Sequence, residues 1–267
     1  MSVSVAFLLT AAVTSAPLPP TSKWQVNFDE GQCLAQRSYG TPDHPLTLAL
    51  KAPASGDVIQ LAIAGDKGGT SEAEQVGGTV GWNSARAHKV SVLQFKAVDA
   101  RRRMYLVNLP KAEVAEAAAS SATQLHVDLG PRAQYSFALA NLPNVMKVMD
   151  QCVQDLRTYW NYVEGEAATS PKLRFRASAS LPSLFSPADY PRVAVQNYQT
   201  GQVEVVLLIR PDGRVADCTL TATSGVASLD SQTCAIIRER ARYKPALGLD
   251  GKPARDVDHA RIRWKMP

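Results

Sequence analysis

Apolar and polar residues alternate in several short runs of the first half of the chain, which is the pattern of a half-buried β-strand. We predict strands over six strand-like runs, several of which alternate in this way: Leu46–Leu50, Val58–Ile63, Val90–Phe95, Tyr105–Leu109, Leu125–Leu129 and Tyr135–Leu139. Glycine and aspartate predict turns at Gly56-Asp57, Asp66–Gly69 and Gly77-Gly78. The Ala- and Glu-rich stretch Lys111–Ser120 predicts a short helix.

A longer amphipathic helix follows these strands. Pro143 and Asn144 open it, and apolar residues then recur at helical spacing as far as Tyr159. Cys152 lies on the apolar stripe, so we expect it to face the core. We therefore predict a β-rich N-terminal domain over residues 22–164, and a linker rich in Ala, Ser and Pro over residues 165–184.

The last part of the chain predicts a second, smaller unit, residues 185–267. We expect strands over Gly201–Ile209 and Val215–Thr223, joined by a tight turn at Pro211-Asp212-Gly213. A helix with Ser228 as its N-cap then ends before Pro245. The whole chain is therefore of the α+β class.

The final strand, Asp258–Met266, alternates strictly. Its apolar residues are Ala260, Ile262, Trp264 and Met266, and its basic residues are Arg261, Arg263 and Lys265. Burying the apolar set against the helix turns the basic set outward. We expect Trp264 to be the largest buried side chain of this strand. One backbone edge is expected to have unpaired N–H and C=O groups, unless a dimer mate or the N-terminal domain covers it.

The net charge and the apolar N-terminal run limit the classes of function that we expect. The chain has 267 residues and a net charge of +5, which weakly favours anionic partners such as acidic peptides or lipid headgroups. No basic block is long enough to indicate nucleic acid. The uncharged apolar run Val3–Val13 is too short to span a bilayer and predicts a signal peptide over residues 1–16, hence export to the periplasm. A buried strand and a retained membrane anchor are the alternatives; any other membrane contact is expected to be peripheral.

Four cysteines agree with export, because an even number in an exported chain indicates disulfides. Two lie in each half, which suggests the pairs Cys33–Cys152 and Cys218–Cys234. No CxxC motif occurs, and no histidine has a second ligand at helical spacing. We therefore expect no metal, no cofactor and no catalytic residues.

Several short motifs occur in a fixed order in the last third of the chain. They are Tyr190-Pro191 with Ala194, Gly201, Asp212-Gly213 with Val215, Ser224-Gly225, Leu229-Asp230, Ala241-Arg242-Tyr243-Lys244-Pro245-Ala246, Gly251-Lys252-Pro253 and Arg263-Trp264. Together they resemble the TonB C-terminal family. The resemblance implies a three-stranded antiparallel sheet packed on helices, and the Cys218–Cys234 pair resembles a recurring variant of it.

The resemblance also implies a mechanism. The last strand would be an exposed edge to which a short segment of an outer-membrane receptor adds as a further strand. Carried onto this chain, the peptide-binding edge comprises His259, Arg261, Ile262, Arg263, Trp264 and Lys265. The basic residues have two interpretations: they prevent edge-to-edge aggregation, or they attract an acidic segment of a partner.

The resemblance leaves three hypotheses for function. A TonB-type energy transducer has an inner-membrane helix and a long Pro-rich spacer, whereas only Pro17–Pro20 resembles a spacer here, and a folded domain stands in its place. We therefore favour a periplasmic binding or adaptor protein over a transducer. An enzyme or enzyme inhibitor in the N-terminal half is the third hypothesis. That half resembles small exported β-rich domains of unknown role, through Trp24, Cys33, Arg37-Ser38-Tyr39-Gly40 and the late helix with Cys152.

Overall fold

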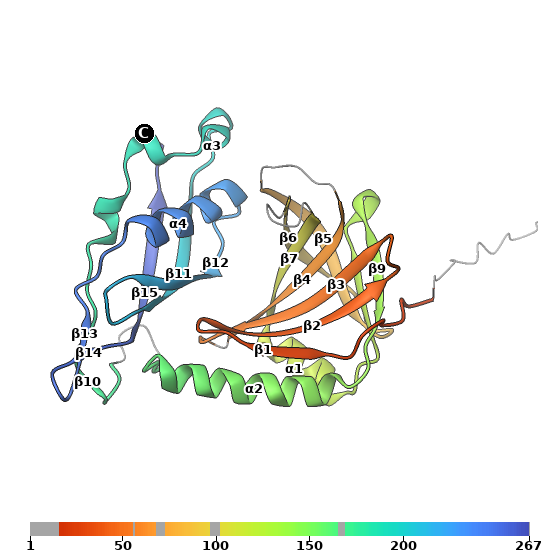
Figure 1. Ribbon diagram of the computed structural model, residues 1–267. Coiled ribbons are helices and arrows are strands. Elements are labelled where there is room, and N and C mark those ends of the chain that lie inside the picture. Colours follow the sequence, from red (N-terminus) through yellow and green to blue (C-terminus); the bar gives the residue numbers. More distant parts are fainter. Residues whose placement is uncertain (1–15, 56, 68–72, 97–101, 165–168, 267) are drawn as a thin grey trace, which may run out of the picture.

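The computed structural model describes residues 16–55, 57–67, 73–96, 102–164 and 169–266. The predicted signal peptide lies outside the described residues except for Ala16, and the predicted turns at Gly56-Asp57 and Asp66–Gly69 lie partly outside them. The chain forms a large curled antiparallel sheet with a few helices, followed by a small three-stranded sheet (Figure 1). This mixed architecture confirms the predicted α+β class.

The N-terminal sheet has nine strands in the order β1-β2-β3-β4-β7-β6-β5-β8-β9. The strands are β1 (Gln25–Phe28), β2 (Gln32–Gly40), β3 (Pro45–Pro53), β4 (Val58–Lys67), β5 (Glu74–Trp82), β6 (His88–Lys96), β7 (Arg102–Pro110), β8 (Gln124–Asp128) and β9 (Gln134–Ala138). All six strands predicted in this half are present. Strands β1, β2 and β5 were not predicted: β1 is short and has no buried position, and the buried positions of β2 and β5 hold mostly small residues or stand beside glycines.

The segment just before β1 closes the curled sheet. The Leu18 N–H donates to the Ser136 carbonyl at 2.7 Å, and Pro20 forms a bridge with Tyr39 of β2. The segment therefore lies between β9 and β2.

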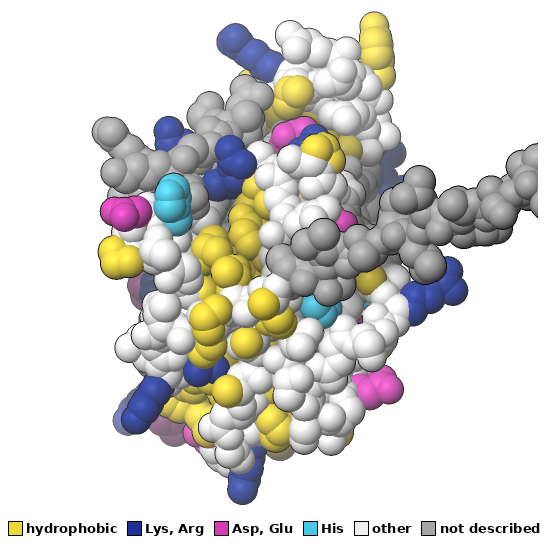
Figure 2. Space-filling model, turned by 90° about the vertical axis from the view of Figure 1, so that its right-hand side faces the viewer, with side chains coloured by type: hydrophobic (Ala, Val, Ile, Leu, Met, Phe, Trp, Pro, Cys, Tyr) yellow, Lys and Arg dark blue, Asp and Glu magenta, His cyan; other side chains and the backbone are white. Residues whose placement is uncertain are grey.

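On the face turned away from the C-terminal domain, hydrophobic side chains gather in a band (Figure 2), so the outer surface of this domain is not uniformly polar.

Helices α1 (Lys111–Ala119) and α2 (Leu142–Tyr159) lie side by side below the curled sheet (Figure 1). The apolar face of α2 is buried in the core, as its periodicity predicts. The Cys33–Cys152 disulfide, with Cα atoms 6.0 Å apart, ties β2 to this helix. The predicted pairing is therefore present.

The predicted turn at Gly77-Gly78 is wrong, because both glycines lie inside β5. The backbone of β5 passes close to its neighbours here: a Cβ on Gly78 would lie 2.8 Å from Leu129 Cδ2 and 2.9 Å from the Asp128 carbonyl oxygen. Glycine at this position allows neighbouring backbones to approach closely; it does not mark a turn of the chain.

The C-terminal unit contains a three-stranded sheet in the order β12-β11-β15. Its elements are β10 (Leu173–Phe175), the 3-10 turns η2 (Leu181–Leu184) and η3 (Pro187–Asp189), α3 (Arg192–Gln196), β11 (Gly201–Ile209), β12 (Val215–Ala222), α4 (Ala227–Arg240), β13 (Ala246–Gly248), β14 (Pro253–Ala254) and β15 (Asp256–Trp264). Helix α4 covers one face of the sheet. Strand β10 pairs with β13, so the second half of the predicted linker packs with this unit.

The prediction of Ser228 as the N-cap of α4 is wrong, since the helix already begins at Ala227. The Asp230 carboxylate organises this end of the helix instead. It accepts hydrogen bonds from the Ser224 N–H at 2.8 Å and from the Ser224 hydroxyl at 2.7 Å. Gly225, with φ of +82°, lets the loop turn sharply between β12 and α4.

An ion pair between the buried Asp189 carboxylate and the exposed Arg240 in the C-terminal unit predicts a dependence of stability on pH. Hydrogen bonds from Arg240, at 2.7 Å, and from Ser186 lower the pKa of Asp189 far below its ordinary range. A lowered pKa stabilises the folded state above the unfolded-state pKa of about 4, and this stabilisation is lost as the pH falls below it. We expect Asp189→Asn to lower Tm at pH 7 and to flatten its decline between pH 5 and pH 3. Asp212→Asn, in an exposed turn, is the control; equal pH profiles for the two variants would contradict the assignment.

Candidate functional site

Strand β15 is an edge strand of the three-stranded sheet. It pairs antiparallel with β11 along its whole length, from Gly201 opposite Trp264 to Ile209 opposite Asp256. Among the described strands, β11 is the one strand that β15 pairs with. The family resemblance therefore pointed to a strand that has an open side in this structure.

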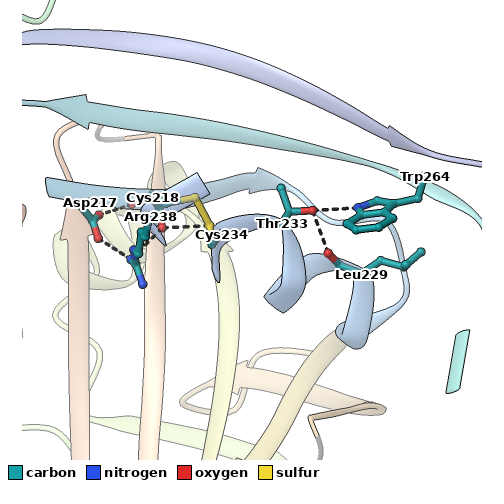
Figure 3. The surroundings of a disulfide bond; sticks show 8 residues. Asp217, Cys218, Leu229, Thr233, Cys234, Arg238 and Trp264 are labelled. Atoms are coloured by element: carbon teal, nitrogen blue, oxygen red, sulfur yellow. Dashed lines mark hydrogen bonds and ion pairs between the residues drawn. A yellow bond between two sulfur atoms is a disulfide. The ribbon is translucent and has the colours of Figure 1, made fainter. Parts of the chain in front are cut away.

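The apolar residues of β15 face α4, as their alternation predicts. Ile262 and Trp264 are buried. The Trp264 ring makes edge contacts with Phe185 and Tyr190, with centroids 5.5 Å and 5.3 Å away. Its Nε1–H donates to Thr233 Oγ1 at 2.9 Å (Figure 3). Trp264 is therefore the buried anchor of the strand, and its side chain is not available to a partner.

The basic residues of β15 lie on the opposite face and are exposed. Arg261 Nε donates to Glu204 Oε1 at 2.8 Å, and Arg263 Nη2 donates to Gln202 Oε1 at 3.2 Å. Both contacts join cross-strand partners on β11. Glu204 thus compensates part of the positive charge, which leaves Arg263 and Lys265 as the cationic end of the edge.

Hydrogen bonds at the start of β15 reveal which backbone groups face outward. The Val257 N–H donates to Asp256 Oδ1 at 2.8 Å, and its carbonyl accepts from Arg176. Val257 therefore turns its backbone away from β11. Because backbone direction alternates along an antiparallel strand, Arg263 also directs its N–H outward, whereas Ile262 directs its N–H to β11.

In the described part of the chain, other residues cover the outer side of β15 at its beginning only. Arg176 and Ala177 cover its beginning, since the Ala177 N–H donates to the buried Asp256 carboxylate at 2.8 Å. The stretch His259–Trp264 remains, which is about 20 Å of strand at roughly 3.3 Å per residue. That length is sufficient for a partner strand of ordinary size.

The N-terminal domain covers part of the sheet face that carries the basic residues. Val206, Leu208 and Val257 on this face belong to the hydrophobic core of the N-terminal domain. The Tyr162 ring lies 6.3 Å from the His259 ring. The two domains therefore touch, and the open face expected for the basic residues is confined to the end of β15 where Arg263 lies.

Polar contacts reinforce this junction around Glu30, in the turn between β1 and β2. The Trp160 Nε1–H donates to the Glu30 carbonyl at 2.6 Å, and Arg210 forms an ion pair with the Glu30 carboxylate at 2.8 Å. The Arg255 guanidinium lies 3.9 Å from the centroid of the Tyr159 ring. These contacts link β11 and the start of β15 to the C-terminal end of α2.

Apart from Arg263-Trp264, the family-motif residues hold the small domain together and do not line the β15 edge. Gly213, with φ of +80°, passes so close to the Tyr243 carbonyl oxygen that a Cβ would lie 2.1 Å from it. The Tyr190 hydroxyl donates to the Gln199 carbonyl at 2.6 Å, and Leu229 is fully buried. Pro191 precedes α3, and Pro245 stands directly before β13.

The second predicted disulfide, Cys218–Cys234, joins β12 to α4, with Cα atoms 5.7 Å apart (Figure 3). Arg238 lies beside it: Nη2 donates to Asp217 Oδ1 at 2.8 Å and to the Cys218 carbonyl at 3.2 Å. The disulfide therefore holds α4 against one face of the three-stranded sheet. The N-terminal domain contacts the other face.

In the part of the chain that the structure describes, no group of three or more His, Cys, Asp or Glu side chains is placed to hold a metal ion. Within the same ranges, no helix is both long and apolar enough to cross a membrane.

The comparisons with known proteins concern the C-terminal unit. The family model described as Gram-negative bacterial TonB protein C-terminal matches residues 186–266. The search of curated proteins and the search of solved structures found no match for the chain. Residues 186–266 are thus similar to TonB C-terminal domains, as the motifs of the last third of the chain predict, and the match is confined to this unit.

Proposed function

We propose that this chain is a periplasmic binding or adaptor protein, and not an enzyme, that recognises an extended peptide of another envelope protein. The peptide adds as a fourth strand to the accessible part of β15, His259–Trp264. The observation that carries this proposal is that β15 is an edge strand with outward backbone groups beyond the part covered by Arg176. A TonB C-terminal domain supports an envelope protein as the partner, and an outer-membrane receptor is the candidate that the family suggests.

Strand addition would use main-chain groups for affinity and side chains for selectivity. A peptide strand would satisfy the outward N–H and C=O groups of alternate residues of β15. Its own side chains on the basic face would lie beside Arg263 and Lys265, both exposed. The edge therefore favours a segment with acidic residues.

Arg263→Pro tests the outward N–H. Proline removes this donor while leaving the Ile262 N–H, which faces β11, in place. We expect the affinity for peptides from envelope proteins to fall at least about tenfold, since one hydrogen bond is lost and the partner acceptor is left unsatisfied. The measurement is isothermal titration calorimetry with the full chain.

Arg263→Ala is the matched control, because it removes the same side chain but keeps the donor. Equal affinities for the alanine and proline variants, in chains that fold, would show that the backbone edge is not the binding site. Ile262→Pro is a poor test, because it would break the ladder to β11 instead.

Charge reversal separates the two interpretations of the basic face. If the arginines attract an acidic segment, Arg261→Glu with Arg263→Glu lowers the association rate and makes binding less sensitive to salt. If they only prevent edge-to-edge aggregation, peptide binding is unchanged. The readout is surface plasmon resonance at low and high ionic strength.

An energy transducer for outer-membrane receptors is the alternative, which the apolar run Val3–Val13 favours if it stays in the membrane. Sequencing the N-terminus of the native protein distinguishes the two. A mature start near Ala16 or Pro17 removes the anchor and contradicts the transducer. A retained apolar segment contradicts the adaptor as a freely diffusing periplasmic protein.

A further inference from the structure

A cavity of about 440 Å³ lies between the two domains. One wall is the outer face of the curled sheet, where β4, β7, β6 and β5 are neighbours. The other wall is the end of β12 and the first turn of α4. Cavities of this size at domain interfaces are common sites for small ligands and short segments of chain. The cavity does not include β15, so it is separate from the proposed peptide edge.

The cavity has an apolar centre. Leu93 of β6 and Leu106 of β7 are cross-strand partners, and both are half-buried. Among the described residues, neither is part of the core of the N-terminal domain. Leu220 of β12 belongs to the opposite wall. Three leucines from two domains therefore offer an aliphatic surface that the fold itself uses only in part.

Amide side chains border this centre. Gln60 Nε2 donates to Asn108 Oδ1 at 3.1 Å, and Gln75 Nε2 donates to the Ser91 hydroxyl. Gln75 Oε1 is buried and has no hydrogen-bond partner among the described residues. A buried acceptor without a partner is unfavourable, so a ligand that supplies an N–H donor would be stabilised here.

The charges of the lining are compensated or solvated. Glu113 accepts from the Trp82 indole N–H at 2.8 Å and lies 3.4 Å from His88 Nε2. Asp230 already accepts hydrogen bonds from the loop before α4. Lys89 is exposed to solvent. Because the described lining residues place no uncompensated charge in the interior, the cavity favours an uncharged ligand.

We propose that this cavity binds an uncharged, extended peptide segment. One aliphatic side chain of the peptide lies against Leu93, Leu106 and Leu220, and its backbone amides bond to Gln60 and Gln75. A neutral sugar fits less well, because no aromatic ring, the usual platform for a sugar face, is among the described residues of the lining.

The probe is a blocked hexapeptide of Ser, Gly and Asn with one central Leu, titrated into the full chain. The reporter is the indole N–H signal of Trp82 in ¹⁵N NMR spectra, because this group bonds to Glu113 in the cavity wall. The chain has four tryptophans, so Trp82→Phe assigns the signal. We expect a saturable shift, which the same peptide with Gly in place of Leu does not produce.

Leu106→Gln removes part of the apolar surface and is expected to weaken peptide binding about tenfold. Ser91→Tyr, at an exposed position of the lining, fills the cavity and is expected to give at least the same loss. Leu34→Gln is the matched control, since Leu34 is half-buried on β2 and outside the cavity. Arg263→Pro is expected to leave this binding unchanged, which separates the cavity from the β15 edge.

The proposal is overturned if the Leu peptide gives no saturable shift. It is also overturned if folded Leu106→Gln and Ser91→Tyr bind as tightly as the parent chain. A shift with tri-N-acetylglucosamine but not with the Leu peptide would assign the cavity to a sugar and overturn the peptide assignment.

Discussion

Replacing both Cys33 and Cys152 with alanine is expected to lower the free energy of unfolding by about 4 to 5 kcal/mol. The bridge spans 119 residues of sequence, so without it the unfolded chain gains a large amount of conformational freedom. Both cysteines are buried where α2 meets β2, so their sulfur atoms also contribute to packing. Urea unfolding followed by circular dichroism measures the loss.

The second disulfide gives a matched comparison within the same chain. Cys218 and Cys234 are only 16 residues apart, so the corresponding double alanine variant is expected to lose about 3 kcal/mol. Adding reductant to the parent chain is expected to approach the sum of both losses. A larger loss from the short bridge than from the long one would contradict this ordering.

Trp264→Ala has the second large expected effect, a loss of about 3 to 5 kcal/mol from the C-terminal domain. The substitution removes a buried ring that contacts Phe185 and Tyr190, and it leaves a cavity between β15 and α4. The free energy of unfolding of a small domain is itself only a few kcal/mol, so this loss is a large fraction of it. We therefore expect this part of the chain to unfold at a lower temperature than the N-terminal domain, as hydrogen exchange can measure.

Trp264→Phe is the control, since it keeps an aromatic ring but loses the hydrogen bond to Thr233. We expect a loss of only about 1 to 2 kcal/mol. Thr233 still donates to the Leu229 carbonyl at 2.8 Å, which limits the effect of losing the tryptophan partner. Equal losses for phenylalanine and alanine would mean that ring packing contributes little.

Much of the fold was predictable where large apolar residues alternate with polar ones, as in β8 and β15. The strands that were missed have weak contrast. In β2 the buried positions are Cys33, Ala35 and Tyr39, and two of these three are small. In β5, glycines that allow close backbone approach looked like turn residues. Alternation in a sequence reveals buried positions when these positions hold large apolar residues. In both strands the small residues weaken the alternation.

The sequence predicted which strand forms the candidate site. It did not predict which part of that strand is accessible to a partner. Alternation identified which side chains of β15 are buried, and the resemblance identified the strand as an edge. The structure adds that Arg176 covers its beginning and that Glu204 compensates Arg261. Both partners are distant in sequence, so no local pattern could reveal them.

One feature of the sequence does indicate the contact between the two domains. Val205–Ile209 is a run of five apolar residues in an antiparallel strand, where alternation is usual. All five are buried, because α4 covers one face of β11 and the N-terminal domain covers the other. The run indicates burial on two faces, but it does not identify the second layer. The interdomain cavity has no comparable trace, since its leucines lie on three separate strands.

The closure of the curled sheet by Leu18 bears on how far the molecule can extend from a membrane. If the apolar run Val3–Val13 remains embedded, four residues connect it to Leu18, which already bonds to Ser136. Four residues span at most about 14 Å. The N-terminal domain would then rest on the bilayer surface, and the junction at Glu30 would hold the TonB-like domain beside it. Partners would then have to come to the membrane, because a connection of four residues is far too short to reach across the periplasm.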